Sequence, residues 1–345
     1  TEIYTLSLHD ALPICLPEKG PGQVLAVVLA IQPKWLARMV SILVQRLPES
    51  LFWQVLTAGR AIQSEGYRAE VLSALVQNEP KVAREALVTA RRIQDERWRA
   101  QVLIKLTHHL PKDMLGQVLE SARAIQDEWH RAEVLNGLVQ HLPKDALGQI
   151  LEVARAIRDE DSRASVLSEV AQRLPGAAGE ALAAVRAIQV EGQRARMLSK
   201  LAQFMPEVTG EALAAARVLE REMFRVEVLI KLTPYLPESA FGQVLEAIRP
   251  LKEVSRALVL SALAQRLPEV VGEALVTART IQNEESRARA LSVLAKRLPE
   301  LTGEALEAAR TIRDEESRAY VLRDWTQCLP EVAGEALNAA CKVDE

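Results

Sequence analysis

Histidines are the first residues in this sequence whose type and spacing could do chemistry. His108 and His109 are adjacent, and His130 and His141 follow close behind. Neutral imidazole is the commonest protein ligand for metals, so such a cluster could hold an ion. His109 and His141, however, each precede a Leu-Pro pair, at a site where Arg173 stands in a later copy of the same pattern. A cation there would complement the carbonyl end of a helix, and we expect this structural role rather than a metal site.

Nucleophiles and cofactor motifs are the second kind of chemistry to consider. The three cysteines, Cys15, Cys328 and Cys341, form no CxxC pair and have no histidine at metal-ligand spacing. No acidic pair, Ser/His/Asp set or glycine-rich phosphate loop interrupts the repeat pattern either. We therefore predict no catalytic residues, no cofactor and no metal. The cysteine usage favours a reducing, cytoplasmic compartment.

The most regular charged feature is a Glu followed three residues later by an Arg. One interpretation is an anion-binding stripe for the phosphates of a nucleic acid. We favour a structural ladder in which each Arg is neutralised by its own Glu or by that of the next copy, at roughly 0.2–0.5 kcal/mol per exposed pair. Phosphate binding would require positive charge without a partner. The pairs are Glu65 and Arg68, Glu96 and Arg99, Glu128 and Arg131, Glu160 and Arg163, Glu191 and Arg194, Glu222 and Arg225, Glu253 and Arg256, Glu284 and Arg287, and Glu315 and Arg318.

The two residues between each Glu and its Arg change from copy to copy, so they are free to serve a partner. The candidate partner contacts are Tyr67, Trp98, Trp129, His130 and Phe224. Aromatic residues are frequent in binding hot spots, which supports a contact role. The alternative, which we favour for the rings, is that they pack over the seam between neighbouring copies.

These residues are positioned by a pattern that repeats about ten times. A proline marks each copy, with spacings of 31 or 32 residues throughout. A fixed period of this length predicts a stacked array of one supersecondary unit. The marker residues are Pro17, Pro48, Pro80, Pro111, Pro143, Pro175, Pro206, Pro237, Pro268, Pro299 and, for a half-unit, Pro330.

Each copy is predicted to form two short helices. In the copy from Pro299, Ala305, Ala309 and Ile312 form one apolar stripe at the helical period, and Ala319 with Leu322 begins a second. Preceding the second helix is a residue suited to cap it, because its side chain can accept from a free backbone N–H. These residues are Ser64, Asp95, Asp127, Asp159, Asn283 and Asp314. Neither stripe is buried by one hairpin alone, so we predict an all-α fold, a right-handed α-solenoid.

Composition supports this fold and argues against some partners. The 345 residues are 49% hydrophobic and 26% charged, with a net charge of −3 and a pI of about 6.1. This balance argues against nucleic acid or anionic lipid as the partner. Without a run of eighteen apolar residues, the sequence predicts no membrane span.

The two ends of the chain depart from the repeat. Residues 1–14 look like the in-frame translation of a short-read sequencing adapter, and we expect them to be a non-native leader before a single repeat domain at 15–345. We expect the native sequence to begin near Cys15, inside a copy, as a fragment of a larger protein. The last copy, from Pro330, ends after its first expected helix. This indicates either a degenerate half-repeat that caps the array or a truncated reading frame.

Pro250 interrupts one first helix. Its ring would clash with the carbonyl of Glu246, so the sequence predicts a bend or a shortened helix there.

The junction from Asp314 to Arg318, followed by Ala319 and Leu322, resembles the turn of short HEAT-like repeats. The array is also similar to tetratricopeptide repeats, although the period of those is longer. The whole pattern looks like repeat arrays attached to large bacterial signalling proteins. This resemblance implies a non-catalytic scaffold or sensor that binds a protein or peptide. The alternatives are a nucleic-acid-binding helical repeat and a lyase-like enzyme related to HEAT-repeat proteins.

Overall fold

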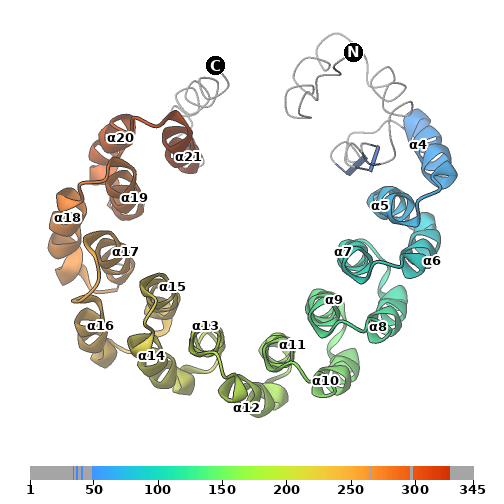
Figure 1. Ribbon diagram of the computed structural model, residues 1–345, viewed down its shortest axis with the longest axis horizontal. Helices are drawn as coiled ribbons and strands as arrows, with labels where there is room; N and C mark the ends of the chain where they lie inside the picture. The colour runs from blue at the N-terminus through green and yellow to red at the C-terminus, as the bar shows by residue number, and fades with distance from the viewer. Residues whose placement is uncertain are drawn as a thin grey trace, which may run out of the picture. The chain divides into compact units, whose positions relative to one another are not determined.

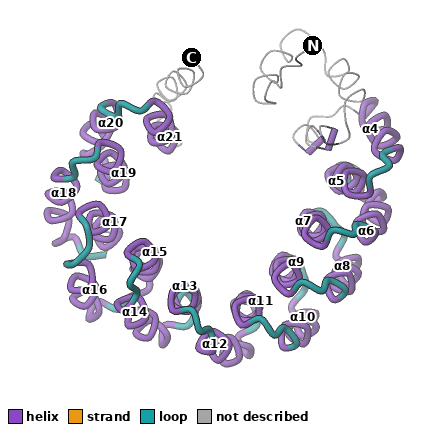
Figure 2. Tube along the Cα trace, in the orientation of Figure 1, coloured by secondary structure: helices purple, strands orange, loops and turns teal. Residues whose placement is uncertain are grey.

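The computed structural model describes residues 34, 36–37, 40–41, 49–264, 266–295 and 298–326. Over these ranges the fold is an all-α solenoid of consecutive helical hairpins, as the proline spacing predicts, and contains no strand (Figure 2). Several features of the sequence lie outside the described residues: the leader at 1–14, most of the copy from Pro17, the half-unit from Pro330, and Cys15, Cys328 and Cys341.

Each described repeat contributes a first and a second helix. The first helices are α4 (Glu49–Ala61), α6 (Ala83–Arg92), α8 (Leu115–Arg123), α10 (Leu147–Arg155), α12 (Ala178–Ala187), α14 (Thr209–Val218), α16 (Phe241–Ile248), α18 (Val271–Thr280) and α20 (Thr302–Arg310). The second helices are α5 (Glu65–Leu75), α7 (Glu96–Thr107), α9 (Glu128–His141), α11 (Glu160–Arg173), α13 (Glu191–Leu201), α15 (Glu222–Leu232), α17 (Glu253–Leu263), α19 (Glu284–Ala295) and α21 (Glu315–Thr326).

The chain divides into two compact units, one ending at Ala184 and one beginning at Val185, within α12. In each unit the second helices form an inner row and the first helices an outer row (Figure 1). Second helices pack directly on one another, as α7 does on α9 in the first unit and α17 does on α19 in the second. Each second helix also packs on the first helix of its own hairpin or of the next.

Recurring small and large apolar residues explain this packing. Ala100 and Leu103 on α7 are fully buried, and so are Ala132 and Leu135 at the same positions of α9. An Ala on the contact face lets neighbouring helices approach closely, while the Leu one turn later fills the layer between them. The apolar stripes predicted from the sequence are therefore the core of the stack.

Caps begin the second helices as predicted, with one exception. Asp95 accepts a hydrogen bond from the backbone N–H of Trp98, 2.6 Å away, and Asp127, Asp159, Asn283 and Asp314 cap their helices in the same way. The expected cap at Ser64 is wrong, since its side chain makes no such bond.

Prolines do more than end the preceding helix. In several repeats the marker proline begins a short 3₁₀ turn, such as Pro80–Val82, which leads directly into the first helix. Pro250 has the predicted effect: α16 ends at Ile248 after eight residues. None of the helices in the described part of the chain combines the length and apolar character that crossing a membrane requires.

Candidate functional site

The junction, where the first helix of a repeat turns into its second, is held by the recurring Arg. Arg99 donates to the carbonyl oxygen of Ile93, 2.8 Å away, just past the end of α6. Carbonyls at a helix end lack an internal partner, so this bond closes the turn. Equivalent bonds, six residues back, are made by Arg68, Arg131, Arg163, Arg194, Arg225, Arg287 and Arg318. Arg256 makes none, because Pro250 occupies the corresponding position and the chain there takes another course.

The recurring Glu often reaches forward to the next repeat. Glu96 accepts from the backbone N–H groups of Gln126 and Asp127, at 3.0 and 2.8 Å. Glu128 does the same with Arg158 and Asp159. These backbone hydrogen bonds stabilise the ionised carboxylate, so they lower the pKa of both Glu96 and Glu128. The carboxylates therefore join consecutive repeats.

Ion pairs within the second helix are made by only part of the expected ladder. Four of the nine pairs lie within ion-pair distance, namely Glu65–Arg68, Glu96–Arg99, Glu128–Arg131 and Glu315–Arg318. In the described structure the other five, Glu160/Arg163, Glu191/Arg194, Glu222/Arg225, Glu253/Arg256 and Glu284/Arg287, form no ion pair with each other. Arg163, Arg194, Arg225 and Arg287 still donate to the junction carbonyl, as the ion-paired Arg residues do. Glu284 lies 3.7 Å from Arg313 of the next repeat.

Tyr67 and Trp98 lie together on the seam between α5 and α7. Their rings meet edge to face with centroids 4.9 Å apart, and the indole N–H of Trp98 donates to Glu70. The indole also covers Gly66, where a Cβ would overlap the ring. Both rings are half-buried. Their contacts are those of residues that pack adjacent repeats.

Trp129 and His130 differ in their exposure. The Trp129 side chain remains 57% exposed at the start of α9, with its ring 4.8 Å from that of His130. The Nδ1 of His130 lies 2.8 Å from the Asp127 carboxylate, which also accepts from the His130 backbone N–H. Trp129 is thus the most accessible ring among the candidate contacts, and His130 supports the junction behind it.

Phe224 forms part of a groove between α13 and α15. The groove has a volume of about 460 Å³ and lies between the first turn of α13 and the junction before α15. Gly192 faces the Phe224 ring, while the guanidinium groups of Arg196 and Arg221 lie 5.3 and 5.8 Å from its centroid. Val190, 59% exposed, forms part of the rim. We refer to this site as the Phe224 groove.

Neither helix that borders the Phe224 groove has a side-chain cap. Val190 precedes α13 and Arg221 precedes α15, at the position where Asp or Asn caps five other second helices. Glu191 also makes none of the forward hydrogen bonds that Glu96 and Glu128 make, within the described part of the chain. The groove therefore presents Val190 and Arg221 at the two positions where five other second helices carry a capping Asp or Asn, and Glu191 and Glu220 line it as well.

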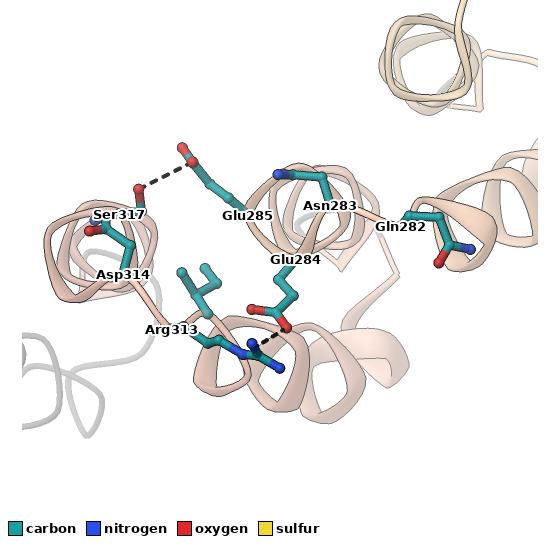
Figure 3. A pocket seen from close by; sticks show the side chains of 8 residues that line it. Gln282, Asn283, Glu284, Glu285, Arg313, Asp314 and Ser317 are labelled. Atoms are coloured by element: carbon teal, nitrogen blue, oxygen red, sulfur yellow. Dashed lines mark hydrogen bonds and ion pairs between the residues drawn. The ribbon is translucent and has the colours of Figure 1, made fainter.

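The same position in a later pair of repeats is filled differently. This second groove, between α19 and α21, has a volume of about 450 Å³. In Figure 3 Ser317 bonds to Glu285, and Arg313 points to Glu284. Asp314 caps α21 through the Ser317 backbone N–H. Its polar groups are thus engaged with one another, which makes it a natural comparison for the Phe224 groove.

The histidines at the ends of α7 and α9 lie close together. The rings of His108 and His141 are 4.7 Å apart, and His109 contacts Gln77 through its Nε2 at 3.0 Å. Burial lowers the pKa of His109 and His141, and the nearby His108 lowers both further. These shifts disfavour the charged form that the predicted role as helix-terminal cations requires. At the corresponding site Arg173 does fill that role, donating to the carbonyls of Val139 and Leu142.

The outer row carries ion pairs that sequence reasoning did not identify. Arg155 at the end of α10 donates two hydrogen bonds, from Nε and Nη2, to the carboxylate of Glu180 at the start of α12. This pairing lowers the pKa of Glu180. The same spacing joins Arg60 to Glu85, Arg186 to Glu211 and Arg279 to Glu304. The sequence carries part of this signal: the residue after the glycine or arginine at the start of the first helix is Glu in these repeats, whereas it is Gln at 117, 149 and 243.

Comparison with known proteins does not assign this chain to a family. No protein-family model matches the chain, and none of the curated proteins compared with it matches. Among the described residues no group of three or more His, Cys, Asp or Glu side chains is placed to hold a metal ion. The candidate site is therefore defined by its own geometry, the junctions along the inner row.

Proposed function

We propose that this chain is a non-catalytic, cytoplasmic scaffold of HEAT-like helical repeats, which binds a protein or peptide along its junctions. One observation supports this most strongly. Residues common to the copies are engaged within the stack, as the Arg99 bond to Ile93 illustrates. Residues that vary, such as Trp129, Val190 and Met223, remain exposed at the junctions.

Apolar side chains exposed at the edge of a polar surface are typical of protein interaction sites. Met223 is 84% exposed and Trp129 is 57% exposed. Their exposure costs the fold hydrophobic stabilisation and therefore favours a role outside the fold. The association with bacterial signalling proteins that the sequence resembles remains part of this proposal.

Selection from a random peptide display library on the intact chain tests the proposal. We expect selected peptides to bind saturably, with dissociation constants in the micromolar range or tighter. Fluorescence anisotropy with single-stranded RNA at about 50 mM salt provides the contrasting measurement, since electrostatic binding is strongest at low salt. RNA binding that weakens steeply with salt, without any selected peptide, would overturn the proposal in favour of nucleic acid.

A further inference from the structure

We propose that the Phe224 groove docks an extended peptide with an aliphatic side chain against Phe224 and a neighbouring carboxylate on Arg221. This inference rests on the proposed function, because it names the partner class for one of the junctions. In this groove an exposed apolar residue, Val190, lies beside Arg221, which has no ion-pair partner among the described residues.

Its apolar surface comes from residues of two neighbouring repeats that depart from the common pattern. Leu219 is buried beneath the groove, and Phe224 stands where Ser is found in four other copies. The Phe224 ring lies against Gly192, where a Cβ would approach it at 3.3 Å. An aliphatic side chain of a partner fits such a floor, and aromatic anchors of this kind dominate interface energetics.

The positive charge comes from Arg221. No carboxylate among the described residues lies within ion-pair distance of Arg221, whereas Arg196 is paired with Glu227 at 2.8 Å. In the second groove the residue equivalent to Arg221 is the capping Asp314, and the Arg one residue before it, Arg313, lies 3.7 Å from Glu284. A guanidinium held over an aromatic ring keeps its N–H edge free for a carboxylate, which it can bind through two parallel hydrogen bonds.

Two acidic residues narrow the expected ligand. Glu191 and Glu220 also line the groove, so a run of acidic residues would be repelled. One carboxylate directly beside an apolar residue satisfies Arg221 without approaching both acids. The expected motif is therefore Asp or Glu next to Leu, Ile, Val or Met in an extended segment.

The central experiment replaces Arg221 with the residue that caps other helices. Arg221→Asp removes the cation and installs a cap on α15, so the variant is expected to remain folded. The matched control is Ser64→Asp, which installs the same cap on α5 in the first unit. Peptides selected on the intact chain from a random display library are the probe, measured by fluorescence anisotropy. We expect enrichment of the motif, and binding about tenfold weaker to Arg221→Asp but unchanged for Ser64→Asp.

A second variant tests the apolar half of the site. Phe224→Ser introduces the residue of four other copies and should weaken the same peptides about tenfold, while circular dichroism confirms helix content. A selected pool without the acidic-apolar motif, or peptides that bind both variants with unchanged affinity, would overturn the assignment of this groove and leave the scaffold function standing. Failure to select any peptide on the intact chain would overturn both.

Discussion

Side-chain volume at two neighbouring positions couples each repeat to the next. Gly66 lies beneath Trp98, Gly192 faces Phe224, and Glu285 instead bonds to the small Ser317. A large residue in one repeat is thus met by a small one in its neighbour. The aromatic rings at Trp98 and Phe224 are explained by this fit, because each covers the glycine of the preceding repeat.

Gly66→Ala is expected to destabilise the chain. A Cβ at Gly66 would overlap the Trp98 indole, and overpacking of this kind costs about 1–3 kcal/mol. The higher helix propensity of alanine stabilises the helix by less than about 1 kcal/mol, so the free energy of unfolding should fall overall. The midpoint of urea denaturation, followed by circular dichroism at 222 nm, measures it.

Gly116→Ala is the matched control for this substitution. A Cβ at Gly116 meets nothing within 4 Å, so alanine should raise the stability by about 0.5 kcal/mol. In addition, Gly66→Ala combined with Trp98→Ser should recover part of the loss. Equal effects of the two glycine substitutions would show that the Trp98 contact does not limit the volume at Gly66.

Histidine titration at the inner row is expected to make stability fall as the pH falls below about 6.5. Burial lowers the pKa of His109 and His141, with His108 acting on both and Arg173 on His141. Each therefore binds its proton less readily when folded, so the unfolded chain takes up more protons in that window. His141→Gln should reduce the fall in urea midpoint between about pH 7.5 and 5.5.

NMR titration of the ring protons provides the direct measurement. His109 and His141 should titrate below the ordinary value for histidine. Glu133, whose pKa is raised by burial, contributes a trend of opposite sign, so the comparison with His141→Gln isolates the histidine effect. Ordinary titration of both rings in the folded chain would contradict the prediction.

At the scale of the element, the Arg that closes each junction is expected to stabilise the hairpin. Arg287 donates to the Ile281 carbonyl at 3.0 Å, and Arg287→Met would leave that carbonyl without its partner. The expected cost is about 1–2 kcal/mol. Arg256 is the control in the preceding repeat, since its Nε is buried without a hydrogen-bond partner. Arg256→Met should change the thermal midpoint little. An equal loss of stability in Arg256→Met and Arg287→Met would contradict the stabilising role of the junction hydrogen bond.

Local signals explain why much of each hairpin could be predicted from the sequence. The marker prolines and the caps at Asp95 and Asp127 act within a few residues, so their effects follow from the residues alone. Pro250 likewise shortens α16 by removing one backbone donor. The cap predicted at Ser64 was wrong because its hydroxyl, although suited to capping, makes no hydrogen bond to the backbone of α5.

Interactions between repeats were harder to predict. The forward reach of Glu96 depends on where the next repeat places its backbone N–H groups, and that position depends on helix packing. The Phe224 groove needs Val190, Gly192 and Arg221 together, and these lie on two repeats. Phe224 was a candidate contact from the sequence alone, and its contact with a partner stays a prediction.

At the scale of the whole molecule, stacked units whose contacts are mainly with neighbours should tolerate loss of a complete repeat. Deleting residues 268–298 removes one full period. The junction that contains Val254 is then followed by the one with Ser317, in place of the one with Ser286. Deleting residues 206–236 removes the same number of residues. The junction that contains Gly192 is then followed by the one with Ser255, so the space beside Gly192 that Phe224 fills is left empty.

We therefore expect both deletion variants to remain helical, with the 268–298 deletion melting at the higher temperature. Phe224 is half-buried, so the packing lost with its ring is worth about 1 kcal/mol, which supplies the difference. Thermal unfolding followed by circular dichroism measures both midpoints, and the Gly192→Leu substitution should raise only that of the 206–236 deletion by filling the void. Equal midpoints, or rescue of both deletions by Gly192→Leu, would show that the fit between neighbouring junctions does not determine which repeats can be joined.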